Sequence, residues 1–380
     1  MNFNEILLNE NIIQALKLEN ITTPTPIQEK IIPNFTNYGN VIIQSQTGSG
    51  KTYSYLLPIY QSLAEKQEKN VQVLIVLPTR ELCMQVHNQV QILSKNSGLG
   101  LKSVAIFGNA NIQNQIEKLK EKPQIVIGTT DRILELINKK KLSVHNVKHL
   151  IVDEADKLLD EKNIISLLNI KKKLLRDVKI TLVSAFFNAK SLDNVNQISN
   201  NFELLKIEEN LIPDTITHLF LVCDSRNKLE NLRKIIAIEK SNKNLVFINK
   251  LNEINVAVDK LNYHKLTCNG IHSDTLKEER KRQLENFKNG KFKVLVCTDV
   301  ASRGLQINNI EYVFSLTISE NPIDYLHRCG RTGRNGNKGT SICFVTKNEL
   351  KYITKYSNKF NIKFKEIKLK NVQVNTIDNI

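Results

Sequence analysis

The sequence predicts an α/β protein with two tandem domains, each built on a doubly wound parallel sheet. Short apolar runs alternate with helical patterns from residue 41 to about residue 207, and the alternation restarts after a less patterned stretch that contains Pro213. Such alternation is typical of parallel sheets with helices on both faces. A length of 380 residues is sufficient for two cores of this kind.

The apolar runs define the expected strands. In the first domain they are Val41–Ile43, Val73–Leu77, Val104–Phe107, Ile125–Gly128, Leu150–Val152 and Ile180–Val183. In the second they are His218–Val222, Leu245–Ile248, Lys265–Cys268, Val294–Cys297, Val313–Leu316 and Ser341–Val345. We predict a first domain over residues 1–207, a short linker over 208–215, a second domain over 216–372 and a weakly patterned tail over 373–380.

The first apolar run leads into a glycine-containing loop with the features of a triphosphate site. The loop and the start of the helix that follows it comprise Ser45, Gln46, Thr47, Gly48, Ser49, Gly50, Lys51 and Thr52. Glycines let backbone N–H groups surround phosphate oxygens, and a helix N-terminus adds partial positive charge. Lys51 is placed to reach the β- and γ-phosphates, and Thr52 to ligate Mg²⁺. The alternative is a turn that binds nothing, because Ser45 replaces the leading glycine of the general pattern.

A second apolar run, Leu150–Val152, ends in a cluster of carboxylates. Ligands of parallel α/β sheets gather at the carboxyl ends of the strands. Asp153 is predicted to hold the metal ion, and Glu154 to be the base that polarises the attacking water. Thr52 and Asp153 share one ion only if their strands are neighbours in the sheet, and we predict that they are.

Arginines gather near the end of the second domain. The chain has eleven arginines among 54 basic residues, and Arg328, Arg331 and Arg334 lie within seven positions. A planar guanidinium binds phosphate through two parallel hydrogen bonds, which an ammonium group does not. Arg331 and Arg334 are therefore predicted to stabilise charge on a transferred phosphoryl group as arginine fingers. The alternative is a basic turn on an RNA-facing surface.

Composition indicates the kind of partner and the compartment. The net charge of +16 favours a polyanionic partner, although a compositional bias toward lysine gives the same charge. No apolar stretch approaches the roughly 18 residues of a membrane span. Met1 is not followed by a basic, apolar leader, and the six cysteines show no C-x-x-C spacing. We expect a cytoplasmic protein without a membrane segment or a zinc site.

Taken in chain order, these segments resemble the motifs of the DEAD-box RNA helicases of superfamily 2. The Q motif, within residues 1–29, matches Phe3 with Pro24–Gln28, and the segment Asp153–Asp156 is the Asp-Glu-Ala-Asp sequence that gives the family its name. The other matches are Ser45–Thr52 for motif I, Pro78–Leu82 for motif Ia, Ser184–Ala185 for motif III, Thr298–Gly304 for motif V and His327–Arg334 for motif VI. The resemblance implies two RecA-like domains, ATP and Mg²⁺ as cofactors, and RNA bound through its backbone without sequence preference. No motif assigns a protein partner, and we expect a monomer.

The resemblance also implies roles for single residues. The implied catalytic residues are Lys51, Asp153, Glu154, Arg331 and Arg334. Phe3 is implied to stack on the adenine, Gln28 to read its edge, and Gly304 to contact the nucleotide. The implied RNA contacts are Arg80, Gly108, Thr129, Arg132, Arg280 and Thr298.

Five departures from the family pattern affect the parts that couple hydrolysis to RNA. Phe186 replaces the threonine of motif III, and Gln306 replaces the aspartate that ends motif V. The segment at motif Ib is Thr129-Thr130-Asp131-Arg132, in which Asp131 introduces negative charge that should weaken RNA binding. The glycine pair of the RNA-facing loop reads Gly108-Asn109, and Lys277 replaces the glutamine ahead of Arg280.

The expected function is local, non-processive unwinding or remodelling of short RNA duplexes, driven by RNA-stimulated ATP hydrolysis. The alternative is an ATP-gated RNA clamp or annealing factor that separates strands poorly, which Phe186 and Gln306 favour. A DNA helicase has no specific support, because no residue pattern here specifies deoxyribose.

Overall fold

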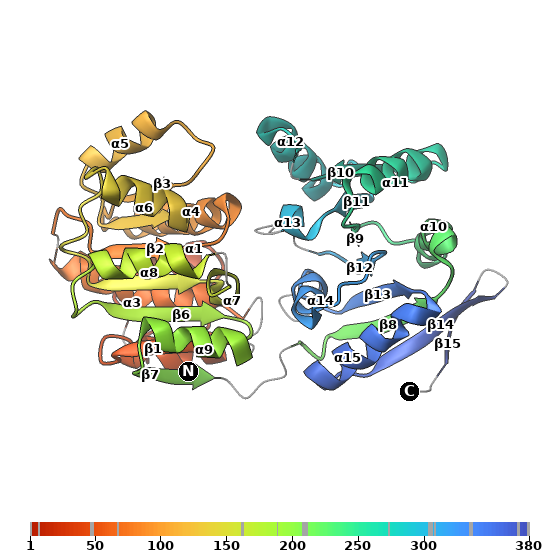
Figure 1. Ribbon diagram of the computed structural model, residues 1–380, viewed down its shortest axis with the longest axis horizontal. Coiled ribbons are helices and arrows are strands. Elements are labelled where there is room, and N and C mark those ends of the chain that lie inside the picture. The colour runs from red at the N-terminus through yellow and green to blue at the C-terminus, as the bar shows by residue number, and fades with distance from the viewer. Residues whose placement is uncertain are drawn as a thin grey trace. The chain divides into compact units, whose positions relative to one another are not determined.

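The computed structural model describes residues 2–6, 8–45, 49–66, 68–160, 163–187, 189–206, 212–272, 274–302, 307, 309–333, 337–370 and 373–377. The chain divides into two compact units, Met1–Glu209 and Asn210–Ile380 (Figure 1). This division falls inside the stretch 208–215, which the sequence predicts to be a linker. Among the described residues, no helix is both long and apolar enough to span a membrane.

The first unit contains a seven-stranded sheet in the order β3-β4-β2-β5-β6-β1-β7, with every neighbouring pair parallel. Its strands are β1 Asn40–Gln44, β2 Val73–Val76, β3 Ser103–Ile106, β4 Ile125–Gly128, β5 His149–Asp153, β6 Lys179–Ser184 and β7 Phe202–Lys206. Its helices are α1 Glu10–Leu18, α2 Pro26–Ile31, α3 Lys51–Lys66, α4 Arg80–Ser97, α5 Ile112–Lys120, α6 Thr130–Asn138, α7 Ala155–Leu158, α8 Ile164–Lys173 and α9 Ala189–Ile198, with a 3₁₀ turn at Ile32–Asn34.

The second unit contains an eight-stranded sheet in the order β10-β11-β9-β12-β13-β8-β14-β15. Its strands are β8 Ile216–Val222, β9 Asn244–Phe247, β10 Cys268–Ile271, β11 Val294–Cys297, β12 Tyr312–Ser315, β13 Gly339–Val345, β14 Phe364–Lys370 and β15 Gln373–Ile377. Its helices are α10 Lys228–Glu239, α11 Leu251–Tyr263, α12 Lys277–Lys288, α13 Asp299–Ser302, α14 Pro322–Cys329 and α15 Leu350–Phe360, with 3₁₀ turns at Ser225–Asn227 and Lys347–Glu349.

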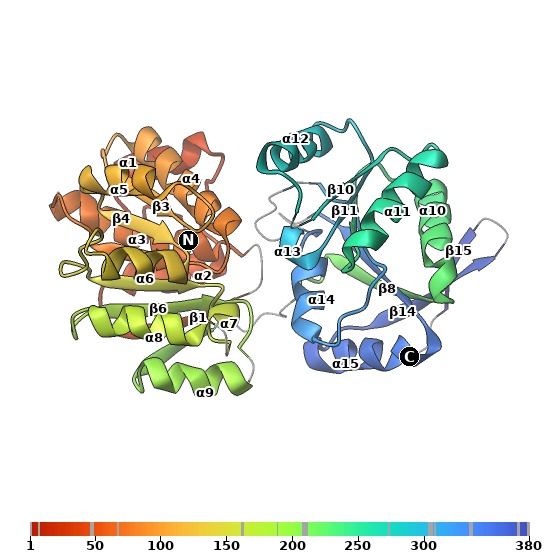
Figure 2. The same ribbon diagram turned by 45° about the horizontal axis from the view of Figure 1, so that its top comes forward.

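Both sheets are covered on two faces, as the apolar runs require. Along β5, Ile151 packs into one apolar cluster, while Leu150 and Val152 pack into another on the opposite face. Helices α1 to α4 contribute to the first cluster, and α5, α6, α8 and α9 to the second (Figure 2). The structure therefore confirms two doubly wound, RecA-like sheets. The strands β14 and β15 pair antiparallel and are an addition at the edge of the second sheet.

Three strands were missed by sequence reasoning, and one is shifted. In β7 only Leu205 is buried, so this edge strand has no apolar run. Strands β14 and β15 lie in the lysine-rich C-terminal region, and β15 occupies part of the predicted tail. Strand β10 begins at Cys268, where we predicted a strand to end. It includes Gly270, where a Cβ atom would lie 2.8 Å from the Ile254 side chain of α11, so close packing selects glycine over an apolar residue.

Candidate functional site

The phosphate loop joins β1 to α3. Gly50 has φ +88°, and a Cβ atom there would lie 2.5 Å from the Gln28 amide nitrogen, so both conformation and space require glycine. The Lys51 ammonium donates to the Ser45 carbonyl at 2.7 Å, and the Ser45 hydroxyl donates to that of Ser49 at 2.8 Å. Residues 46–48 of the predicted nucleotide site (Gln46, Thr47 and Gly48) lie outside the described residues. The described part has the strand, loop and helix order that the sequence predicted.

Lys51 lies in an environment that disfavours its charge. Desolvation lowers the pKa of its ammonium to about 8, although the negative charges of Asp153, Glu154 and Asp156 oppose the shift. A desolvated ammonium with acidic neighbours is suited to bind polyphosphate, because bringing more negative charge close stabilises its protonated form.

Gln28 connects the predicted adenine-binding segment to the phosphate loop. Its side-chain nitrogen donates to the Gly50 carbonyl at 3.1 Å, and its oxygen accepts from the Thr25 N–H at 3.0 Å. The side chain is 3% exposed, so the structure places it in the wall of the loop. Phe3 is equally buried and belongs to the apolar core of the first unit. Its stacking on adenine stays a prediction.

Asp153 closes β5 and is held by two donors. Its Oδ1 accepts the Glu154 N–H at 2.8 Å, and its Oδ2 accepts the Tyr55 hydroxyl at 2.8 Å. Burial raises the pKa of the Asp153 carboxyl to about 6, and the hydrogen bond from Tyr55 opposes that shift. The carboxylate is thus oriented from both sides before any ligand binds.

Glu154 follows in a left-handed backbone conformation, with φ +50° and ψ +47°. Non-glycine residues adopt this region uncommonly, and such positions are frequent at functional sites. The Glu154 carboxylate accepts from the Lys157 ammonium at 2.5 Å. This ion pair fixes the predicted base on the first turn after the strand.

The sequence prediction that the two metal-binding strands are neighbours is wrong. Strand β6 lies between β1 and β5 and pairs with both. Tyr55 of α3 nevertheless reaches the carboxylate strand, because its hydroxyl donates to Asp153 at 2.8 Å. A side chain of the helix that carries Thr52 thus spans the width of the intervening strand.

Motif III, which begins at Ser184, is hydrogen-bonded to the carboxylate segment after β5 through the Ser184 hydroxyl. The Ser184 hydroxyl, at the end of β6, donates to Asp156 at 2.6 Å and accepts the Phe186 N–H at 3.2 Å. Phe186 is partly buried, while Phe187 packs into the apolar core. The phenyl ring at position 186 has no hydroxyl with which to extend this chain of hydrogen bonds.

The predicted RNA contacts of the first unit follow three adjacent strands. Arg80 begins α4 after β2, Gly108 follows β3, and Thr129 precedes α6 after β4. A Cβ atom at Gly108 would meet no atom within 4 Å, so internal packing does not require glycine there. Arg132 on α6 is paired with Glu135 at 3.0 Å. All of these residues lie at the carboxyl edge of the sheet, which is also the edge of the phosphate loop.

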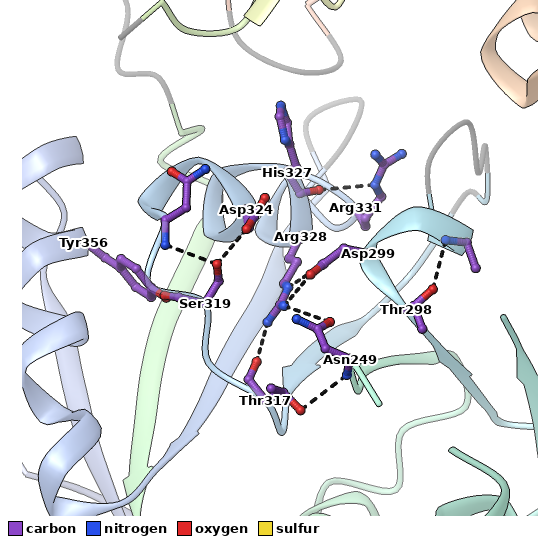
Figure 3. A network of polar contacts seen from close by, with 12 residues as sticks. Asn249, Thr298, Asp299, Thr317, Ser319, Asp324, His327, Arg328, Arg331 and Tyr356 are labelled. Atoms are coloured by element: carbon purple, nitrogen blue, oxygen red, sulfur yellow. Dashed lines mark hydrogen bonds and ion pairs between the residues drawn. The ribbon is translucent and has the colours of Figure 1, made fainter. Parts of the chain in front are cut away.

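The predicted RNA contacts of the second unit are joined through α13. Arg280 donates to the Ala301 carbonyl at 2.7 Å. The Thr298 hydroxyl, labelled in Figure 3, accepts the Ala301 N–H at 3.1 Å. Thr298 thereby caps α13 directly after β11. The two predicted contacts therefore share one short helix.

The Arg328 side chain is buried in the second unit and hydrogen-bonds to residues of that unit. It donates to both oxygens of Asp299 at 2.6 Å, to the Thr317 carbonyl and to Asn249 (Figure 3). Its side chain is 3% exposed. Arg328 therefore hydrogen-bonds to each of the segments that follow β9, β11 and β12.

Arg331 is buried, and its Nε donates to the His327 carbonyl at 3.2 Å. Arg334, Gly304 and Gln306 lie outside the described residues. The arginine-finger assignments therefore stay predictions.

The oxygen donors near the phosphate loop fit Mg²⁺. Among the described residues no group of three or more metal-ligating side chains is present. Mg²⁺ commonly takes one or two protein oxygens and completes its shell with phosphates and waters. The Thr52 hydroxyl and the Asp153 carboxylate are the two oxygen donors that the sequence predicts for this role.

Sequence reasoning missed Tyr55 and did not assign Arg328 a structural role. Tyr55 reads as one apolar residue of an amphipathic helix, and its partner Asp153 is 98 positions away. Arg328 was seen only as part of an arginine cluster. A pairing with Asp299 has no local signal in the sequence.

Comparisons with known proteins agree with this geometry. Residues 25–195 match the model of the DEAD/DEAH box helicase family, and residues 227–336 match the helicase conserved C-terminal domain. A probable ATP-dependent RNA helicase of Bacillus subtilis, YfmL, is 35% identical over 344 residues, which cover 90% of each chain. The DEAD-box ATP-dependent RNA helicase CshC of Bacillus cereus is 32% identical, covering 90% of this chain and 86% of the relative.

Solved structures show the same architecture. The helicase Mss116 bound to single-stranded RNA and UDP-BeF has a TM-score of 0.87 and 26% identity, covering 98% of this chain and 81% of that one. Dbp5 of S. cerevisiae bound to RNA and ADP BeF3 has a TM-score of 0.85 and 25% identity, covering 96% and 95%. From its motifs, its two sheets and these relatives, the chain belongs to the DEAD-box family of ATP-dependent RNA helicases.

Proposed function

We propose that this protein uses RNA-stimulated ATP hydrolysis to separate or remodel short RNA duplexes locally, without processive movement. The proposal depends on one observation above all. The phosphate loop after β1, the carboxylates after β5 and the predicted RNA contacts after β2, β3 and β4 lie along one edge of one parallel sheet. ATP and RNA bound at this edge would contact the same rigid element.

Different residues are proposed to bind the phosphates, hold Mg²⁺, orient the attacking water and stabilise the transferred phosphoryl group. The Lys51 ammonium, held at the loop by the Ser45 carbonyl, binds the phosphates. Thr52 and Asp153 would hold Mg²⁺, which neutralises charge on the phosphate oxygens when bound. Glu154 orients the attacking water and accepts its proton, and the ion pair with Lys157 sets the direction of its carboxylate. Arg331 and Arg334 are proposed to stabilise the charge of the transferred phosphoryl group.

The RNA-binding part of the proposal concerns backbone recognition. Arg80 and Arg132 supply guanidinium groups, and Gly108 supplies a surface without a side chain. Contacts of this kind bind phosphate and ribose and are insensitive to base sequence. The relatives YfmL and CshC are named as RNA helicases, and the Mss116 and Dbp5 structures contain RNA.

The test compares ATP hydrolysis and strand separation on RNA and DNA duplexes in parallel. We expect RNA to stimulate hydrolysis and DNA to do so much less. Glu154→Gln should keep ATP binding and slow turnover by about 10²-fold, the scale of losing a positioned base. Equal turnover by the wild-type protein and Glu154→Gln at saturating RNA would defeat the role of Glu154.

An ATP-gated RNA clamp or annealing factor is the second candidate, and Phe186 favours it. The hydrogen-bonded path from Asp156 through Ser184 reaches the Phe186 backbone, and the phenyl ring has no hydroxyl with which to extend it. In that case Phe186→Thr should raise the number of base pairs separated per ATP, with ATP hydrolysis changing less than about tenfold. Strong unwinding by the wild-type protein that Phe186→Thr leaves unchanged would eliminate the clamp.

A further inference from the structure

Tyr55 is a buried tyrosine whose hydroxyl contacts one of the two residues proposed to hold the metal ion. The side chain is 0% exposed and projects from α3, the helix that begins with Lys51 and Thr52. Its hydroxyl donates to Asp153 Oδ2 at 2.8 Å.

Tyr55 also completes the orientation of Asp153. The Glu154 N–H fixes one carboxylate oxygen and the Tyr55 hydroxyl fixes the other. Each oxygen accepts more than one hydrogen bond or ligand, so the carboxylate keeps capacity for a cation. Because β6 separates β1 from β5, strand pairing does not link α3 to Asp153, whereas the tyrosine does.

We propose that Tyr55 is a positioning residue that orients the Asp153 carboxylate to receive Mg²⁺ together with the nucleotide. This inference rests on the proposed ATPase function. Groups that hydrogen-bond to metal ligands typically change metal affinity by 10- to 100-fold when they are removed. The competing explanation is that Asp153 only satisfies the hydroxyl of a buried core tyrosine, which would affect stability but not metal affinity.

The test is Tyr55→Phe in the full chain, which keeps the ring and removes the hydroxyl. Mn²⁺ is titrated into protein saturated with ADP, and free Mn²⁺ is followed by electron paramagnetic resonance. We expect Mn²⁺ to bind about tenfold more weakly than in the wild type. ADP affinity measured in EDTA should stay the same, because the phenol does not contact the Lys51 ammonium in any described hydrogen bond.

The same helix offers a matched control. Tyr60 is also buried on α3, and its hydroxyl pairs with the Ser97 hydroxyl at 3.3 Å, away from the carboxylates. Tyr60→Phe should leave Mn²⁺ affinity at the wild-type value. Thermal unfolding of both variants sets a temperature at which each is folded for the titration.

The outcomes separate this inference from the proposed function. Equal Mn²⁺ affinity in Tyr55→Phe and Tyr60→Phe, or tighter binding in Tyr55→Phe, would overturn the positioning role while leaving the ATPase proposal intact. Wild-type protein that binds ADP in neither EDTA nor Mn²⁺ would overturn the ATPase proposal and this inference with it.

Discussion

Lys51 and Lys228 occupy matching places in the two units. Each is the first residue of the helix that follows the first strand of its sheet, α3 after β1 and α10 after β8. Numbered within each unit, the two sheets share the strand order 3-4-2-5-6-1-7. Lys51 donates to a carbonyl of its own loop, whereas Lys228 donates to the Leu316 carbonyl and to the Glu349 carboxylate.

The loops ahead of these lysines explain the difference. The loop before Lys51 contains Gly48 and Gly50, while residues 223–227 before Lys228 contain no glycine and include Asp224. A loop without glycine and with a carboxylate is unsuited to surround phosphates. The repeated sheet therefore sets the position in each unit, after the first strand, at which a ligand site can form. The loop residues decide whether the lysine serves a ligand or the fold.

The largest expected effect concerns Arg328, which lies in the same arginine cluster as the two predicted arginine fingers. If this arginine serves the fold of the second unit, Arg328→Ala should destabilise that unit by about 3–5 kcal/mol, because it leaves Asp299 without its bidentate partner. Hydrogen exchange of the β11 and β12 amides measures this effect separately from the first unit. Arg328→Lys keeps the charge but not the fork, and should recover only part of the loss.

Exchange at the wild-type rate in Arg328→Ala would show that the Asp299 pair is dispensable for folding.

The two matching lysines give the next contrast. Lys228→Ala should lower the free energy of unfolding of the second unit by about 2 kcal/mol, because Glu349 and the Leu316 carbonyl lose a buried donor. The nucleotide affinity of Lys228→Ala should stay unchanged. Lys51→Ala should weaken nucleotide binding without lowering the free energy of unfolding, because desolvation already disfavours the charge of the Lys51 ammonium.

Denaturant unfolding and equilibrium nucleotide binding of both variants check this contrast. A loss of nucleotide affinity in Lys228→Ala, with Lys51→Ala unaffected, would reverse the assignment of the two lysines.

The third contrast separates the units by their response to acid. Burial lowers the pKa of His218 to about 4, so below the unfolded value of 6.5 the unfolded second unit binds more protons. Stability is therefore fully present above pH 6.5 and falls by about 1.4 kcal/mol per pH unit down to about pH 4. In the first unit, burial raises the pKa values of Asp153 and Asp156, which favours its folded state in mild acid, whereas burial lowers the pKa of His87, which opposes that effect.

Domain-resolved hydrogen exchange between pH 7 and 5 measures both slopes. His218→Asn removes the titrating ring and should flatten the slope of the second unit. An unchanged slope in this variant would assign the acid response to another group.

The central strands and the strand, loop and helix order around Lys51 could be predicted from local sequence. Central parallel strands are buried on both faces, so runs such as Leu150–Val152 are continuous and apolar and can be recognised locally. The loop needs glycines, lysine and threonine in a fixed local order, and that order is also visible in the sequence. The edge strands β7 and β15 could not be predicted this way, because neither has a continuous apolar run.

The partners of individual side chains became known from the tertiary structure alone. The order of strands places β6 between β1 and β5, which the sequence does not encode locally. The bond from Tyr55 to Asp153 joins residues 98 positions apart, and the pair Arg328–Asp299 joins residues 29 positions apart. Such pairs form where burial brings a donor to an acceptor that has lost water. Local patterns report burial and backbone conformation, whereas the choice of partner depends on the packing of the whole sheet.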